Sequence, residues 1–413
     1  MTHITSESES EETTFTSSTI NQLLDLAIEA VQREDWFEVS QNLKQIPQDK
    51  SKLWLLEEAS WHKAFDLAVK MLTEADFQHK WEITKIFPRL GTNIIDPLAF
   101  LLLNSYVEVE IRWFICQILG HFNNQRVVVT LVRLLQQTED EELIAIAGKT
   151  LSKIGDGAID ALVKLSTQSQ YRLLAIQSLC YIHTIATINP LLEVTQDINP
   201  EIRTMAIKAL GSFHDCRIPP VLVAGLQDVA SNVRREAVIA LGFRPDLASE
   251  LDLIEHLKLL LHDLNLEVCR QAAVSLGRIK QDKANFALQE VLQKNTTPIS
   301  LKLGIIKALG WSNLDSAVDY LKLALVNQGE ILGQEIIVTL GRIESLPLKQ
   351  KAAQALIDFG QTQQPNSAQI KQALANSLGE LGCDCGQAIL QQLSLDCDRK
   401  VKLYALAALK NIS

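Results

Sequence analysis

The chain has 413 residues, too many for one ordinary compact core, so its length indicates either several domains or an array of repeats. Its formal net charge of −10 at pH 7 argues against nucleic-acid binding unless a basic patch exists locally. Hydrophobic residues make up 47% of the chain, yet no apolar run approaches the ~18–20 residues of a membrane span. The composition therefore predicts a soluble protein without a membrane span.

The N-terminal segment, residues 1–18, is rich in Ser, Thr and Glu. It lacks the basic and apolar regions of a signal peptide, so we expect a disordered acidic tail. The chain has seven cysteines, an odd number that is scattered widely, and we expect them to be reduced thiols. These features together predict a cytoplasmic location.

Residues 19–78 are predicted to be helical but do not share the pattern of the later chain. The stretch 20–47 has the pattern of two short helices broken near Glu34 and Asp35, and a further helical stretch covers 50–72. A terminal segment of a repeat array must cover the exposed end of the stack. We therefore expect a divergent helical N-terminal cap, with a separate docking module as the alternative.

One pattern recurs through residues 79–413: an apolar residue, a basic or polar residue, a helix of small residues, and then Leu-Gly. The glycines at the ends of five copies are spaced by 31, 35, 33 and 31 residues: Gly211, Gly242, Gly277, Gly310 and Gly341. Apolar residues at i, i+3, i+4 and i+7 predict helices, and a second apolar helix follows each copy, as at 218–228. Each unit is thus a predicted helix pair, whose glycine suits a close helix approach or a C-terminal turn. The stretch 361–368 is the clearest predicted interior loop.

An aspartate stands five residues before the start of four of these copies: Asp197, Asp228, Asp263 and Asp396. A short carboxylate at this place accepts hydrogen bonds from backbone N–H groups and braces a turn. We expect Arg203 and Arg234, on successive helices, to pair with such aspartates.

The pattern D-x-x-x-x-V-R-x-x-A-x-x-A-L-G resembles the HEAT-like repeat family, in particular the subgroup found in phycobilisome bilin lyases of the E/F type and related assembly factors. The resemblance covers about residues 79–413. It implies an all-α fold: a right-handed α-solenoid of about ten to eleven helix-pair repeats. Many proteins with this repeat are scaffolds, adaptors or chaperone-like factors, so the motif implies the fold far more strongly than it implies a function.

No catalytic constellation is recognisable. The stretch "AGKT" at 147–150 lacks the first glycine of a phosphate loop, because Leu143 occupies that place. Cys383 and Cys385 in "GCDCG" are weak metal candidates, and a helix of ~13 Å separates them from Cys397. Two exposed turn cysteines are the simplest interpretation, with a partner-shared metal or iron–sulfur site and redox sensing as alternatives. We predict no catalytic residue, no metal and no cofactor, unless a bilin binds.

The resemblance implies that the first helix of each pair lines the concave face. Two variable positions on that helix, after the Arg and after the Leu-Gly pair, carry aromatic and basic residues, which are enriched at binding hot spots. The alternative for each tryptophan is packing in the core. The predicted partner-binding residues are Trp81, Arg89, Trp113, His121, Tyr181, Phe243, Arg270, Arg278, Trp311 and Arg342. Their cations suit an acidic protein surface or the propionates of a tetrapyrrole.

These observations leave three functional hypotheses open. The first is a non-enzymatic scaffold or assembly factor that holds a protein partner in the concave groove. The second, implied by the resemblance, is a phycobilin lyase or bilin-handling factor acting on a phycobiliprotein subunit, and it is the only enzymatic one. The third is a partner in iron–sulfur or related cofactor assembly, which rests on the two close cysteines alone.

Overall fold

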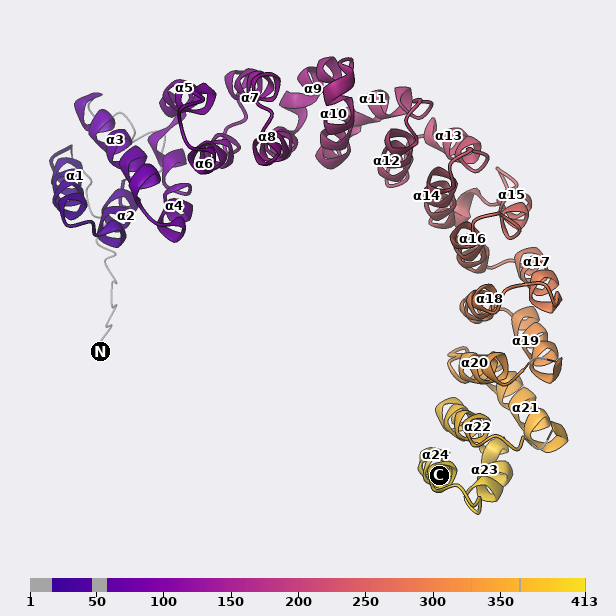
Figure 1. Cartoon of the computed structure of the whole chain (residues 1–413). Coiled ribbons are helices and arrows are strands. Elements are labelled where there is room, and N and C mark those ends of the chain that lie inside the picture. The colour runs from indigo at the N-terminus through magenta and orange to yellow at the C-terminus, as the bar shows by residue number, and fades with distance from the viewer. Residues whose placement is uncertain (1–16, 47–57, 328, 364, 413) are drawn as a thin grey trace, which may run out of the picture. The chain divides into compact units, whose positions relative to one another are not determined.

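The computed structural model describes residues 17–46, 58–327, 329–363 and 365–412, and within these ranges every regular element is a helix (Figure 1). The chain divides into two compact units, Met1–Leu191 and Leu192–Ser413, called unit 1 and unit 2 below. The predicted all-α solenoid is confirmed. The predicted tail lies outside the described residues up to residue 16.

The first helices of unit 1 agree with the sequence-based expectation. They are α1 (Ser17–Gln32), α2 (Trp36–Lys44) and α3 (Glu58–Glu74). The chain breaks after α1 because Glu34 takes a left-handed conformation with φ 55°, and the Asp35 carboxylate then caps α2 by accepting the N–H of Glu38. Residues 50–57 of the third predicted helix lie outside the described ranges. Helix α3 packs on both α1 and α4, so these helices are joined to the repeats that follow.

The rest of unit 1 consists of helix pairs. Its elements are α4 (Phe77–Ile83), η2 (Phe87–Leu90), η3 (Thr92–Ile94), α5 (Ile95–Leu103), α6 (Val109–Leu119), α7 (Gln125–Gln137), α8 (Glu141–Ile154), η4 (Gly155–Ala158), α9 (Ile159–Ser166), α10 (Ser169–Ile182) and η5 (Ile185–Thr187). Helix α11 (Ile188–Glu193) crosses into unit 2. Helices α6, α8 and α10 pack in one row and α5, α7 and α9 in another.

Unit 2 repeats the same arrangement. Its elements are α12 (Pro200–Leu210), α13 (Ile218–Gly225), α14 (Ser231–Gly242), η6 (Pro245–Leu247), α15 (Leu253–Leu260), α16 (Leu266–Ile279), α17 (Asp282–Gln293), α18 (Ile299–Ser312), α19 (Asp315–Asn327), α20 (Glu330–Gly341), α21 (Leu346–Gln363), α22 (Ala368–Leu381), η7 (Asp384–Gly386), α23 (Gln387–Leu393) and α24 (Arg399–Ile412). The expected loop at 361–368 is shorter than predicted, because α21 continues to Gln363.

Unit 2 has two rows of helices. The even row, α12 to α24, carries the Leu-Gly pattern, and each member packs on the next. Figure 1 shows the even row along the inner edge of this unit and the odd-numbered helices along its outer edge. The leucine of each Leu-Gly pair is at most 1% exposed in both units, as at Leu119, Leu210 and Leu340. The periodic apolar positions therefore form the continuous core.

The repeat glycines allow close approach between consecutive even helices. A Cβ atom added to Gly211 would lie 2.5 Å from the Cβ of Ala240 on the next helix, and one on Gly341 would lie 2.5 Å from the Cβ of Ser377. Both distances are too short for a carbon contact. The glycine thus faces a small residue of the following repeat, as the close-approach interpretation of the sequence predicted.

The predicted arginine–aspartate pairs are confirmed in unit 2. Arg203 donates from Nε and Nη2 to both carboxylate oxygens of Asp228 at 2.7 Å, and Arg234 makes the same paired contact with Asp263 at 2.7 and 2.8 Å. Each arginine also donates from Nη1 to a backbone carbonyl of its own turn, on Asp197 or Asp228. We call this arrangement the brace, because one guanidinium fixes its own turn and the aspartate of the next.

Candidate partner-binding surface

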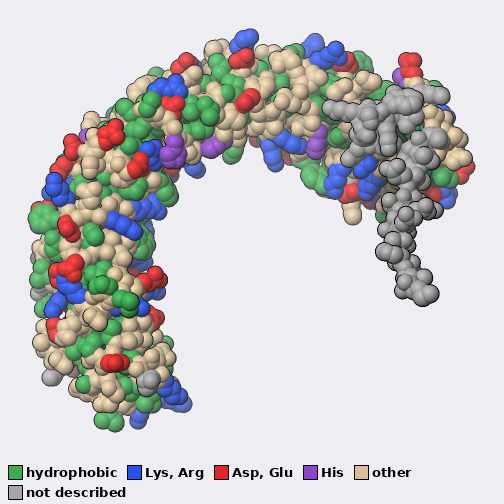
Figure 2. Space-filling view, turned by 180° about the vertical axis from the view of Figure 1, so that it is seen from behind, with side chains coloured by type: hydrophobic (Ala, Val, Ile, Leu, Met, Phe, Trp, Pro, Cys, Tyr) green, Lys and Arg blue, Asp and Glu red, His purple; other side chains and the backbone are tan. Residues whose placement is uncertain are grey.

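The even row of unit 2 is basic, although the chain as a whole is acidic. Helices α12, α14, α16, α18, α20, α22 and α24 contain thirteen Lys and Arg residues but six Asp and Glu residues. The whole chain instead has 39 basic and 49 acidic residues. Lys and Arg side chains are visible along the inner edge of unit 2 in Figure 2. Three of these cations, Arg203, Arg234 and Lys371, pair with aspartates of the turns, so the remaining positive charge of the row lies on the others.

Four of the predicted residues lie at the C-terminal ends of consecutive even helices in unit 2, two in the last turn and two directly after the helix. Phe243, Arg278, Trp311 and Arg342 come from α14, α16, α18 and α20, which pack on one another in that order. Phe243 is 63% exposed and Trp311 is 54% exposed. The guanidinium carbon of Arg278 lies 4.2 Å from the centre of the Phe243 ring, a cation–π contact across two repeats. These four residues, of which Arg278 is half-buried and the others are exposed, are called the exposed strip below.

Arg270 lies apart from that strip, nearer the start of α16. Eight residues separate it from Arg278, which corresponds to ~12 Å along a helix. Its guanidinium is exposed and pairs with Glu267 of the same helix at 3.3 Å. Lys307, one repeat further on, pairs with Glu335 at 3.8 Å. Arg342 is exposed and has no charged partner among the described residues.

In unit 1, Trp81 and Trp113 form the contact that their spacing predicted. Their ring centres lie 6.4 Å apart, with Trp81 on α4 and Trp113 on α6. Trp81 is 43% exposed, and Trp113 also packs edge-on against the buried Phe114. The exposed Phe77 contacts Phe114 from the other side, at 5.4 Å between ring centres. The two tryptophans thus belong partly to the core and partly to the surface.

Two other predicted residues of unit 1 have structural contacts. The Arg89 guanidinium donates to the backbone carbonyls of Lys44 and Ile46, at 2.6 and 3.3 Å, and so joins η2 to the end of α2. His121 follows α6, and burial, with the nearby charge of Lys153, lowers the pKa of its imidazole. His121 is therefore neutral at pH 7. Neither residue contributes a free cation to the surface.

Tyr181, at the end of α10, borders a groove between α8 and α10. The groove has a volume of about 560 Å³ and is lined mainly by apolar groups, including Ile144, Ala145 and Leu174. Gly148 forms part of its wall, and a Cβ there would lie 2.8 Å from a methyl carbon of Leu174. Tyr181 is 72% exposed at the rim. The sequence identified the tyrosine but not the groove.

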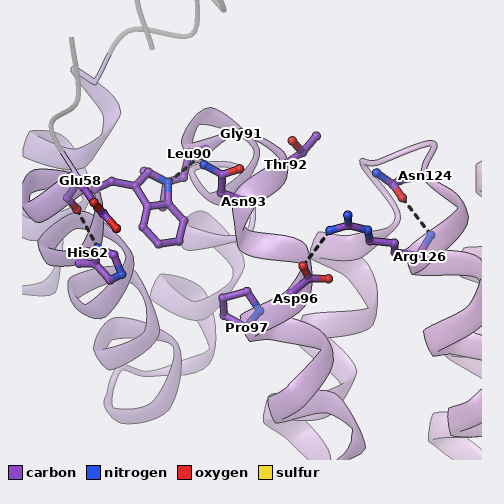
Figure 3. Close-up of a pocket in the computed structure, with 11 residues that line it drawn as sticks. Glu58, His62, Leu90, Gly91, Thr92, Asn93, Asp96, Pro97, Asn124 and Arg126 are labelled. Atoms are coloured by element: carbon purple, nitrogen blue, oxygen red, sulfur yellow. Dashed lines mark hydrogen bonds and ion pairs between the residues drawn. The ribbon is translucent and has the colours of Figure 1, made fainter. Parts of the chain in front are cut away.

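A larger, polar pocket of about 930 Å³ lies between α3, the η2–η3 turn and the starts of α5 and α7 (Figure 3). Its polar groups are largely paired with one another. The Trp61 indole N–H donates to the carbonyl of Leu90 at 2.9 Å, and Arg126 pairs with Asp96 at 2.8 Å. These contacts join successive helices of unit 1, which is a structural role.

The other residues considered as a possible phosphate loop or metal site lie in ordinary structural environments. Residues 147–150, the "AGKT" stretch, lie inside α8. Cys383 and Cys385 lie beside and within η7, and burial, followed by the proximity of Cys385, raises the pKa of the Cys383 thiol. Among the described residues, no group of three or more His, Cys, Asp and Glu side chains is placed to hold a metal ion.

None of the helices described in the structure is long and apolar enough to cross a membrane alone. The segments Phe77–Leu90 and Thr92–Leu103 reach that length and composition only jointly, across a bend of 115°.

The paired helices, their two rows and the brace define the class of the protein as an all-α helical-repeat solenoid. Residues 96–180 and 166–242 match the family profile of HEAT repeats. Residues 96–242 are therefore similar to HEAT repeats. Among curated proteins, none matches this sequence significantly.

Several solved structures are similar in fold. An engineered protein is 19% identical, with 88% of this chain and 98% of that chain covered and a TM-score of 0.36. Human deoxyhypusine hydroxylase in complex with glycerol is 20% identical over 65% of this chain and 99% of that chain, with a TM-score of 0.27. Importin beta is 15% identical over 84% of this chain and 55% of that chain, with a TM-score of 0.48. No function of this chain follows from such distant similarity.

Proposed function

We propose that this protein is a non-enzymatic scaffold or assembly factor that binds an acidic surface of a protein partner along the even row of unit 2. The observation that carries the proposal is the exposed strip of Phe243, Arg278, Trp311 and Arg342 on helices that are locally basic.

The strip has the composition of a protein-binding surface. Exposed aromatic rings supply contact area with few rotatable bonds, and arginines supply fork-shaped donors for carboxylates. Because the even helices pack directly on one another, these side chains stand on rigid elements rather than on long loops. A partner loses little conformational freedom of the scaffold when it binds such a surface.

The test is capture of the partner from native lysate by the full chain, followed by mass spectrometry and by binding measurements with the purified partner. Arg270→Glu combined with Arg342→Glu should weaken binding at least about tenfold, and the remaining binding should depend less on salt. The matched control is Lys283→Glu, which reverses an exposed cation on the odd-numbered helix α17. Equal loss in the control and in the double variant would contradict the proposal.

The aromatic part of the surface has its own pair of variants. Trp311→Ala should weaken capture by about tenfold, whereas Phe286→Ala removes a similarly exposed ring from α17, 49% exposed, and should leave capture unchanged. Trp113→Ala tests the predicted contact surface of unit 1 in the same assay. Normal capture by Trp311→Ala, Trp113→Ala and Arg270→Glu together would rule out the even-row surface.

A phycobilin lyase or bilin-handling factor is the alternative function. It is supported by the resemblance of the repeat pattern to the E/F-type subgroup, and by arginines and aromatic rings of the kind that hold a tetrapyrrole with propionates. Attachment of a reactive bilin to a cysteine of a phycobiliprotein subunit requires mainly orientation of the two reactants. Co-expression with a bilin supply tests it: a visible absorbance band that transfers to the apo-subunit supports a lyase, and a colourless protein contradicts it.

The third proposal, a partner in iron–sulfur or related cofactor assembly, depends on Cys383 and Cys385. It requires that the pair contribute ligands jointly with another protein. If Cys383→Ser with Cys385→Ser leaves capture of every partner intact and the purified complex carries no metal, this proposal is wrong.

A further inference from the structure

The turns that carry the brace also expose one aliphatic side chain each. Ile198, Val229 and Leu264 directly follow Asp197, Asp228 and Asp263, and their exposed fractions are 96%, 93% and 104%. They lie at equivalent places before α12, α14 and α16, which pack on one another (Figure 1). We call these three residues the turn ladder. A single exposed aliphatic residue is ordinary, but full exposure at the same place in three consecutive repeats is a pattern.

Two surface depressions lie beside the turn ladder. A depression of about 520 Å³ lies between the turns of Ile198 and Val229, and its walls include Val221, Ala224 and Val233. A second depression, of about 270 Å³, lies beside Leu264 and includes Pro298. Exposed apolar projections therefore stand next to recesses with both polar and apolar walls, which suits interdigitation with side chains of a partner.

The brace already hydrogen-bonds the backbone of the first two of these turns, and in the third the Cys269 thiol donates to the carbonyl of Asp263. Arg203 donates hydrogen bonds to the backbone carbonyls of Asp197 and Ile198. Arg234 donates in the same way to the carbonyls of Asp228 and Val229. The N–H groups of Asn199, Ala230 and Asn265 donate to the aspartate carboxylates. An extended peptide that adds as a strand needs free backbone partners and finds none in these groups. A helix satisfies its own backbone and needs only side-chain contacts.

The charges of the ladder turns further restrict the class of partner that can bind there. In each ladder turn the aspartate is the charged residue, and Arg203 and Arg234 neutralise Asp228 and Asp263. The turn residues next to Asp197 and Asp228 are uncharged, as at Gln196, Asn199 and Gln227, whereas His262 precedes Asp263 and contacts Lys294 at 3.4 Å. The turns of Ile198 and Val229 thus offer no outward cation to attract an anionic membrane or a nucleic acid. The surface complementary to these two turns is therefore apolar and uncharged.

The distance between neighbouring ladder turns indicates how far apart the contacting residues of a bound helix must be. Packed helices lie ~8–10 Å apart, so equivalent turns of neighbouring repeats are separated by about that distance. Seven residues of an α-helix rise ~10.5 Å. We propose that the turn ladder is a second binding surface, which docks an amphipathic helix of a partner protein whose uncharged apolar residues recur every seven positions.

The experiment uses the full chain and a library of displayed helical peptides about three heptads long, with apolar positions randomised. We expect the retained peptides to carry apolar residues seven positions apart. Retention should fall at least about tenfold on a variant with Ile198→Ser, Val229→Ser and Leu264→Ser. The control is Leu259→Ser, which removes a leucine that is 73% exposed on α15, outside the ladder.

Because the three side chains are fully exposed, the triple variant should keep the thermal midpoint of the parent and its capture of an even-row partner. No enrichment of any peptide, enrichment without the seven-residue spacing, or equal retention by parent and triple variant would overturn the proposal. So would a self-association of the parent, or its binding to uncharged phosphatidylcholine vesicles, that the triple variant loses. Those two results would identify a second copy or a lipid surface as the occupant.

Discussion

The same arginine position makes different contacts in the two units, and this shows how one repeat pattern yields two kinds of joint. Arg203 and Arg234 of unit 2 bind both a backbone carbonyl of their own turn and the carboxylate of the next turn. Arg112 of unit 1 donates to the carbonyl of Leu102 and has no carboxylate partner among the residues that the structure describes. In unit 2 the arginine therefore joins two repeats, whereas Arg112 completes one.

Unit 1 uses aromatic contacts at the corresponding place. Trp81 and Trp113 meet across α4 and α6, where unit 2 has exposed cations and single rings. An aromatic joint depends on apolar contact and is insensitive to pH, whereas a carboxylate joint is lost when the acid is protonated. The brace and the tryptophan pair should consequently respond differently to mutation and to acid, although unit 1 also has carboxylate contacts at Lys80–Glu110 and Arg126–Asp96.

The largest expected effect is on the brace. Arg234→Leu leaves Asp263, whose side chain is 5% exposed, without its cation, and we expect a local loss of about 3 kcal/mol in the free energy of opening. Arg112→Leu removes one hydrogen bond and should cost about 1 kcal/mol. Hydrogen exchange of α14 and α16, compared with that of α5 and α6, measures both. Equal losses in the free energy of opening for Arg234→Leu and Arg112→Leu would contradict the difference between the two arginine positions.

Acid should destabilise the unit 2 joints specifically. Burial raises the pKa of Asp228 and Asp263, but hydrogen bonds from Arg203 and Arg234 outweigh it, and both pKa values are lowered. A lowered folded-state pKa gives stabilisation that is present above the unfolded value, ~4, and is lost as the pH falls through the folded value. The thermal midpoint of the parent should therefore fall as the pH drops below about 4. Arg203→Leu with Arg234→Leu should flatten this fall, and an unchanged slope would contradict the assignment.

The glycine contacts provide a smaller test of the same comparison. A Cβ on Gly211 would lie 2.5 Å from the Cβ of Ala240, whereas one on Gly120 of unit 1 would lie 3.0 Å from a methyl carbon of Thr150, so that a smaller shift relieves the contact. We expect Gly211→Ala to cost about 2 kcal/mol and Gly120→Ala less than about 1 kcal/mol. Thermal unfolding of the two variants measures the difference, and a reversed order would be a contradiction.

The smallest expected effect is at the tryptophan pair. Trp81→Phe keeps a ring at an exposed place, so the free energy of unfolding should change by less than about 1 kcal/mol. It should nevertheless remove the exciton-coupled circular dichroism of two indoles 6.4 Å apart. Trp311→Phe is the control, since Trp311 has no aromatic partner among the described residues. An unchanged signal in Trp81→Phe would show that the rings do not meet.

Much of the fold was predictable because it depends on local rules that repeat. The spacing of Gly211, Gly242 and Gly277 predicted the helix pairs and the close approach, since both follow from helical periodicity and residue size. The position of Asp228 relative to Arg203 predicted the brace, because the same interval recurs in several units. The break at Glu34 and Asp35 was likewise visible as a helix stop followed by a capping residue.

Other features depend on contacts that the repeating sequence pattern does not predict. Arg89 occupies a surface position of the pattern, yet its guanidinium binds carbonyls at the end of α2, outside the repeats. The groove at Gly148 depends on the shape of two helices together. The turn ladder carried a usable signal, an aliphatic residue after each aspartate, but only its full exposure in the structure distinguishes it from a core residue.

The brace also makes an interior repeat of unit 2 removable as a module. Deletion of residues 198–228 would join Asp197 to Val229, so that Arg234 finds the carbonyl of Asp197 in place of that of Asp228 and still reaches Asp263. Both kinds of contact that Arg234 makes, to a backbone carbonyl and to an aspartate, are thereby kept. The length of such a chain can therefore change by whole repeats, during evolution or by design, without a new joint having to be invented.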